Sequence, residues 1–80
     1  MVKKQLNDYK SFIKKLNKLN GKIEKKEIKK IGEDTFKIIL FRIGDFLKNI
    51  LFKNDQMLKI SEIEKYSFLE LSRKISSGQI

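Results

Sequence analysis

The sequence contains no cysteine, no histidine and no proline. Without cysteine, the chain can form neither a disulfide nor a thiolate metal site. Without histidine, it lacks the usual general base and the commonest metal ligand in proteins. No phosphate-binding glycine loop or nucleophile motif is present, and the carboxylates show no spacing that suits acid–base catalysis or magnesium binding. We therefore predict a protein without enzymatic activity, without a cofactor and without a bound metal.

Long apolar runs are also missing. The longest uninterrupted run is Ile38–Phe41, far shorter than the ~20 residues that a membrane-spanning helix needs. Lys3 and Lys4 could open a secretory signal, but the polar residues of segment 5–10 interrupt any apolar stretch of the required length. A membrane-surface helix over 36–52 is an alternative, but its polar strip carries little positive charge. We expect a cytosolic protein that does not contact a membrane.

Positive charge is present in excess and is unevenly distributed. The net charge is +9, and residues 1–30 carry eleven lysines against three acidic residues, a net of +8. Residues 31–80 carry eight basic and seven acidic residues, a net of +1. Such asymmetry predicts a basic face that binds phosphate or an acidic protein surface. The alternative is coding bias, because an AT-rich genome encodes lysine wherever a solvated residue is tolerated.

The predicted polyanion-binding face is formed by the lysines between positions 14 and 30. They are Lys14, Lys15, Lys18, Lys22, Lys25, Lys26, Lys29 and Lys30. Lysines of this density could follow a phosphate backbone and release its counterions, so that affinity would fall steeply with salt. Because lysine is a point charge and lacks the fork of arginine, binding would be largely independent of nucleic-acid sequence.

Composition and apolar spacing favour helices throughout. We predict one all-α domain over residues 1–80, a small four-helix bundle with helices at about 3–19, 22–31, 35–53 and 62–76. The third helix is expected at the centre, because eleven of its nineteen residues are apolar. Gly21 and Gly32 follow the first two helices, Gly44-Asp45 is expected to kink or split the third, and Ser61–Glu64 matches a capping box that opens the fourth.

A β-hairpin over residues 22–43 is the minority alternative. Segments 22–31 and 35–43 would then pair across a turn at 32–34. Against this arrangement, the isoleucines of the first segment do not alternate, and lysine and glutamate are poor strand formers. We favour the helices.

The third helix presents more apolar surface than three short neighbours would cover, which predicts a homodimer or docking onto a larger protein. The candidate interface residues are Phe41, Phe46, Phe52 and Phe68. A helix-turn-helix between 60 and 75 would direct Arg73 and Lys74 toward a major groove, and these two residues are secondary candidates for nucleic-acid binding. However, Glu64 occupies a position that is normally small and the turn lacks glycine, so a single capped helix is the simpler interpretation.

The leading functional hypothesis is a small regulatory binding protein whose lysine-rich N-terminal face contacts nucleic acid or another polyanion. The alternative is a protein-binding inhibitor or immunity factor of phage, plasmid or bacteriocin type, for example an inhibitor of a nucleic-acid-targeting host enzyme. Such proteins are short and lack catalytic residues, and a lysine face can block an acidic surface. This second hypothesis rests on size and composition alone.

Overall fold

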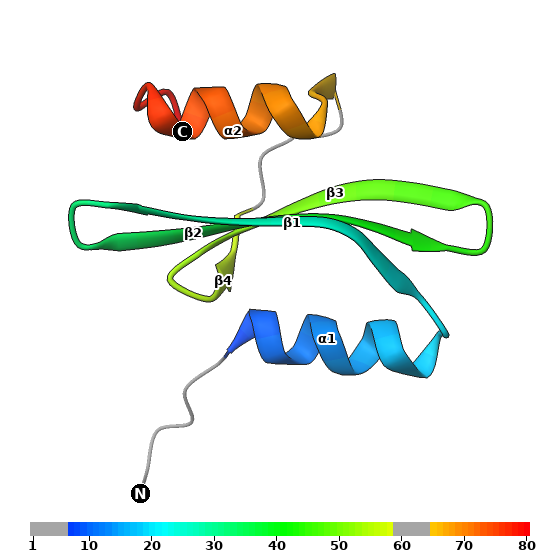
Figure 1. Ribbon diagram of the computed structural model, residues 1–80. Helices are drawn as coiled ribbons and strands as arrows, with labels where there is room; N and C mark the ends of the chain where they lie inside the picture. The colour runs from blue at the N-terminus through cyan, green and yellow to red at the C-terminus, as the bar shows by residue number, and fades with distance from the viewer. Residues whose placement is uncertain (1–6, 59–64) are drawn as a thin grey trace, which may run out of the picture.

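The computed structural model describes residues 7–58 and 65–80. The element order is α1 (Asp8–Lys18), β1 (Lys22–Ile31), β2 (Asp34–Ile43), β3 (Phe46–Lys53), β4 (Gln56–Met57) and α2 (Phe68–Ser76). The strands form one antiparallel sheet in the order β1-β2-β3-β4. The sheet lies between the helices, with α1 on one face and α2 on the other (Figure 1). Neither of these two helices has the length and apolar character that crossing a membrane requires.

The all-α prediction is wrong, because the described chain is built on this four-stranded sheet, and the strands contain more residues than the two short helices. The segments predicted as helices at 22–31 and 35–53 are the strands β1, β2 and β3. Over residues 22–43 the chain has the hairpin of the minority alternative. The first predicted helix is present over Asp8–Lys18, whereas the capping box predicted at 61–64 lies outside the described residues.

The central strands are rich in apolar residues because helices cover the middle of both faces of the sheet. Side chains alternate across a strand, so the run Ile38–Phe41 supplies core residues to both sides of the sheet. The core on the α2 side consists of Phe36, Ile38, Leu51, Leu71 and Ile75. The core on the α1 side consists of Leu16, Ile39, Phe41 and Phe52. The apolar residues of segment 35–53, for which we predicted a partner chain, are thus divided between the two faces of the sheet, and one helix covers those on each face.

Three two-residue turns connect the strands. Ile31 pairs with Asp34 and Ile43 pairs with Phe46, so Gly32-Glu33 and Gly44-Asp45 are complete hairpin loops. The φ angles of Gly32 and Gly44 are +63° and +61°, and a positive φ at the first loop residue alone is the pattern of a type II′ turn. In the third turn Asn54 and Asp55 have φ of +53° and +66°, the pattern of type I′. The two glycines therefore form hairpin turns. From the sequence, we had predicted that Gly32 would end the second helix and that Gly44 would lie at a kink in the third.

Helix α1 is fixed to the sheet at both of its ends. Asp8 Oδ2 accepts a hydrogen bond of 2.8 Å from Met57 N–H, and Tyr9 N–H donates one of 3.1 Å to the Asp55 carbonyl. After the helix, Gly21 lies so close to Leu16 that a Cβ at this position would overlap the leucine side chain. On the opposite face, α2 begins with a capping box between Ser67 and Glu70. Both helices are thus positioned by specific local contacts as well as by their apolar sides.

An ion pair beside α1 makes stability dependent on pH. Lys37 Nζ lies 2.6 Å from Asp55 Oδ1 and 3.9 Å from the centre of the Tyr9 ring. The hydrogen bond from Lys37 holds the pKa of the Asp55 carboxyl below its usual value of 3.8. Since the folded pKa is the lower one, this carboxylate stabilises the fold fully above the unfolded pKa, and the contribution is lost as pH falls through the folded pKa.

We expect Asp55→Asn to lower the free energy of unfolding by about 0.2–1 kcal/mol at pH 7, the range measured for exposed ion pairs. Asparagine accepts the positive φ of this turn position, so the backbone should be unaffected. Urea titrations at pH 7 and near pH 2 measure the difference between the two proteins. A deficit that persists unchanged at the acid pH would show that the ion pair is not its cause.

Candidate nucleic-acid interface

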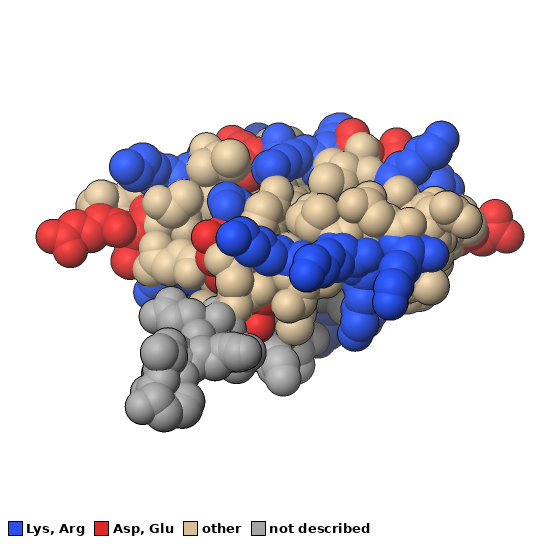
Figure 2. Space-filling model, turned by 90° about the horizontal axis from the view of Figure 1, so that it is seen from below, with Lys and Arg blue, Asp and Glu red and all other residues tan. Residues whose placement is uncertain are grey.

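The solvent side of α1 carries a row of lysines. Tyr9, Phe12 and Leu16 pack toward the sheet, and Lys10, Lys14 and Lys18 are exposed at intervals of four residues. A spacing of four residues separates successive side chains by about 6 Å along the helix axis. Figure 2, which views the molecule from the α1 side, shows Lys and Arg side chains running in a band across this face. The helix therefore presents positive charge outward along its whole length.

The ammonium groups of the α1 lysines have no direct partner in the part of the chain that the structure describes, although the charge of Lys10 also contributes to the lowered pKa of Asp55. The ammonium groups of Lys10, Lys14, Lys15 and Lys18 form neither a hydrogen bond, an ion pair nor a ring contact with residues 7–58 or 65–80. Asp8, the acidic residue of the first turn, is occupied by Met57 N–H. Their positive charge is thus available to an external anion.

The lysines of β1 are divided between the two faces of the sheet. Lys26 pairs with Ile39, whose side chain is in the α1-side core, and Lys25 pairs with Leu40 on the opposite face. A β-bulge between Ile23 and Lys25, with Glu24 as the extra residue, determines on which face of the sheet each of the following β1 side chains lies. Of the eight predicted lysines, those on the α1 side are Lys14, Lys15, Lys18, Lys26 and Lys30. Those on the α2 side are Lys22, Lys25 and Lys29.

Three β1 lysines have partners within the protein. Lys26 Nζ donates a 2.7 Å hydrogen bond to the Tyr9 hydroxyl and lies over the same ring. Lys29 Nζ donates to Ser76 Oγ at 2.8 Å and lies 3.5 Å from a Glu27 carboxylate oxygen. Lys25 lies 5.8 Å from the centre of the Phe68 ring. These contacts fix β1 to both helices, so the predicted single basic face is best developed on α1.

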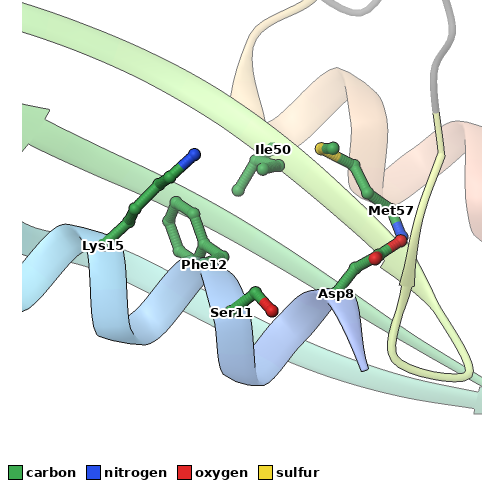
Figure 3. A pocket seen from close by; sticks show the side chains of 6 residues that line it. All are labelled: Asp8, Ser11, Phe12, Lys15, Ile50 and Met57. Carbon is green, nitrogen blue, oxygen red and sulfur yellow. The ribbon is translucent and has the colours of Figure 1, made fainter. Parts of the chain in front are cut away.

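A groove adjoins the lysine row between α1 and the strands β3 and β4. Its volume is about 190 Å³, and its lining consists of Asp8, Ser11, Phe12, Lys15, Ile50 and Met57. Figure 3 shows Lys15 at one end, the Asp8 carboxylate at the other beside Met57, and the Phe12 ring and Ile50 between them. The groove thus combines an apolar floor with side chains of opposite charge at its two ends. Among the described residues, no group of three or more acidic side chains is placed to hold a metal ion.

No protein-family model, curated protein or solved structure matches this chain. The chemistry of the α1 lysine row therefore has to be inferred from its charge, its exposure and its surroundings. Sequence reasoning missed one member of the row, Lys10. Its signal was available, because Lys10, Lys14 and Lys18 recur at the i, i+4, i+8 spacing of one helical face.

The two secondary candidates lie on the other side of the sheet. Arg73 is exposed on α2, and Lys74 Nζ donates to Gln79 Oε1 at 3.0 Å and lies 4.6 Å from the centre of the Tyr66 ring. Because α2 packs Leu71 and Ile75 on the sheet, these cations do not join the α1 lysine row. Much of the first helix of the predicted helix-turn-helix falls on residues 59–64, outside the described part of the chain.

The phenylalanines proposed for a partner interface differ in exposure. Phe41 and Phe52 are 8% and 0% exposed because α1 covers them. Phe68 is half-buried against the α2-side core, and Phe46, at the start of β3, is 55% exposed. Phe46 is therefore the one of the four whose ring lies largely on the surface, and the homodimer stays a prediction.

Proposed function

We propose that this protein is a small, non-enzymatic, cytosolic nucleic-acid-binding protein that contacts the phosphate backbone through α1. The observation that supports this most is the lysine row of Lys10, Lys14, Lys15 and Lys18, exposed on one helix with no direct ion pair among the described residues. By contrast, Lys26 and Lys29 of β1 have partners within the fold. A row of unpaired cations on a well-anchored helix is the arrangement that phosphate binding requires.

The proposed mechanism is counterion release. Each phosphate that a lysine neutralises releases condensed cations, and four such contacts give a log–log slope of affinity against salt of about −3 to −4. Lysine ammonium groups do not read base edges in the bidentate way that arginine does, so the protein should bind different sequences similarly. Its role is then that of a coating or masking protein on nucleic acid, with its position set by backbone contacts.

The test removes the four α1 charges together. We expect the variant Lys10→Gln, Lys14→Gln, Lys15→Gln, Lys18→Gln to lose on the order of 10²–10³-fold in affinity for a labelled 20-mer at 0.1 M salt. Fluorescence anisotropy with single- and double-stranded oligonucleotides at several salt concentrations measures the loss and the slope.

A matched control has the same loss of charge on the α2 side. It carries Lys22→Gln, Lys25→Gln, Lys29→Gln and Arg73→Gln, which removes four positive charges from outside the α1 lysine row. The control is expected to bind within a few-fold of the unmodified protein. Equal losses in the two variants, or no binding of the unmodified protein at low salt, would overturn the proposal.

The protein-binding class stays as the second candidate because of one feature, the outer edge of β1, with which none of residues 7–58 and 65–80 pairs. That edge is long, basic and exposed. A polypeptide can pair with it through main-chain hydrogen bonds, whereas nucleic acid has no peptide backbone with which to do so.

A further inference from the structure

Strand β1 is an edge of the sheet and offers its outer backbone groups along ten residues. It pairs with β2 on its inner side, and no described residue pairs with its outer side. Half of the backbone N–H and C=O groups of an edge strand point away from the sheet and are available to another strand. The outer edge of β1 is therefore a geometric site for one further strand.

The side chains along β1 combine positive charge with exposed isoleucines. On the α1 side the order is Ile23, Lys26, Ile28 and Lys30, and on the α2 side it is Lys25, Glu27, Lys29 and Ile31. Ile28 is 54% exposed, and Ile23 and Ile31 are each 40% exposed. With five lysines and two glutamates, the strand carries a net charge of +3. A strand added here would meet cations on both faces and apolar side chains at a few fixed positions.

A second copy of this chain does not fit the edge. Two antiparallel β1 strands related by a two-fold axis must pair residues from the same face of the sheet. Centring such a pair on Lys26 or Lys29 places that lysine opposite its own copy. Centring it on Glu27 pairs Lys25 with Lys29, and centring it on Ile28 pairs Lys26 with Lys30. Every one of these registers sets like charges directly opposite each other, which is destabilising. The register centred on Ile28 also pairs Glu27 with Lys29, but the two strands each carry a net charge of +3 and therefore repel each other.

The same charges that repel a second copy attract an acidic strand. We propose that the outer edge of β1 binds an extended, acidic segment of another protein, which adds to the sheet as a further antiparallel strand. Main-chain hydrogen bonds to the edge supply affinity, and carboxylates opposite Lys25, Lys26, Lys29 and Lys30 supply specificity. The hydroxyl partners of Lys26 and Lys29 are neutral, so each ammonium group can still donate to a carboxylate. An apolar side chain of the segment covers Ile28. This interaction is independent of the proposed nucleic-acid binding, which uses the α1 lysine row.

The register on β1 specifies a probe. A capped peptide Val-Glu-Glu-Val-Thr-Glu-Glu, running antiparallel to residues 31–25, places glutamates opposite the four lysines, valine opposite Ile28 and threonine opposite Glu27. Titration of this peptide into the isotopically labelled full chain, followed by amide chemical shifts and hydrogen exchange, should perturb and protect amides of β1. Amides of α1 and β3 should change little.

Two controls separate strand pairing from charge attraction. A peptide of the same sequence with N-methyl groups on alternate residues, placed so that its hydrogen-bonding edge is blocked, should bind at least about 10-fold more weakly, since several main-chain hydrogen bonds are lost. The protein variant Lys26→Glu, Lys30→Glu should weaken binding, whereas Lys14→Glu, Lys18→Glu on α1 should leave it within about 3-fold. Circular dichroism of each variant verifies the fold.

Equal affinity for the N-methylated and unmodified peptides would overturn the proposal, as would chemical-shift changes centred on α1. Absence of binding at millimolar peptide would overturn it too. Because the four-glutamine α1 variant retains β1 unchanged, it should still bind the peptide while losing the oligonucleotide. Failure of the β1 proposal and failure of the nucleic-acid proposal are therefore distinguishable in the same pair of proteins.

Discussion

Phe52→Ala is expected to lower the free energy of unfolding by about 3–5 kcal/mol, the cost of removing a buried phenylalanine ring. Phe52 is 0% exposed. Its ring centre lies 5.4 Å from that of Tyr9, in an edge-to-face arrangement with an interplanar angle of 87°, and 5.6 Å from that of Phe12. It also pairs with Met57 across β3 and β4. One side chain thus links α1, β3 and β4, and its removal leaves a cavity beneath the helix.

A loss of this size matters because the domain is small. Stabilities of roughly 0.05–0.15 kcal/mol per residue give an 80-residue chain about 4–12 kcal/mol in total. We therefore expect the variant to be partly unfolded at 37 °C and to have a clearly lower urea midpoint by circular dichroism. Oligonucleotide binding should decline with the folded fraction, because the α1 lysine row is held in place by the packing of α1 on Phe52.

The matched control is Phe46→Ala, on the same strand. Phe46 is 55% exposed and its ring lies 5.3 Å from the Lys48 ammonium group. We expect its removal to cost no more than about 1 kcal/mol, since little apolar area returns to water. Comparable losses for the two phenylalanines would mean that Phe52 does not occupy the α1-side core.

The sequence allowed a correct prediction of α1 because this helix is buried on one side only. Tyr9, Phe12 and Leu16 recur at intervals of three and four, and lysines occupy the opposite side. For residues 35–53, the apolar pattern does not distinguish a helix from a strand. Their apolar positions are so dense that a helical period and a strand buried on both faces describe them equally well. The apolar spacing was interpreted as one long helix, and this was wrong, because the segment forms the two strands β2 and β3.

The missed signal was in the glycines. Gly32-Glu33 and Gly44-Asp45 each lie between apolar segments, and a two-residue loop that begins with glycine is characteristic of type II′ hairpins. If these dipeptides had been given more weight than the helical spacing of the apolar residues, the sheet would have been predicted. Strand β1 would still have been difficult, since its bulge at Glu24 interrupts the alternation and its exposed edge tolerates lysine on both faces.

The candidate site was predictable in composition but not in placement. The concentration of lysine in the first thirty residues is visible in the sequence. Which lysines share a face depends on the conformation of 22–31, because a helix would gather Lys22, Lys26 and Lys29 on one side, whereas the strand separates Lys26 from Lys29. The hydrogen bond from Lys26 of β1 to Tyr9 of α1 joins two residues that are seventeen positions apart in the sequence. No local pattern in the sequence indicates it.

Leu71→Ala is the second variant for which we expect a large effect, a loss of about 2–5 kcal/mol in the free energy of unfolding. Leu71 is 0% exposed and belongs to the α2-side core with Phe36, Ile38 and Leu51. The loss cannot arise from helix propensity, because alanine is a slightly better helix former than leucine. It measures the burial of the second face of the sheet, which is the reason why β2 and β3 carry apolar residues on both faces.

Leu69→Ala is the control on the same helix, two residues earlier. Leu69 is 58% exposed, so the same chemical change should alter the free energy of unfolding by no more than about 0.5 kcal/mol. Urea titration of both variants gives the comparison directly, and the slope of the transition reports whether α2 still unfolds together with the sheet. Equal values for the two leucines would mean that α2 does not cover the sheet. The apolar residues Phe36, Ile38 and Leu51 would then have to be buried by something other than α2. An apolar surface that this chain does not bury was the original reason for predicting a partner chain.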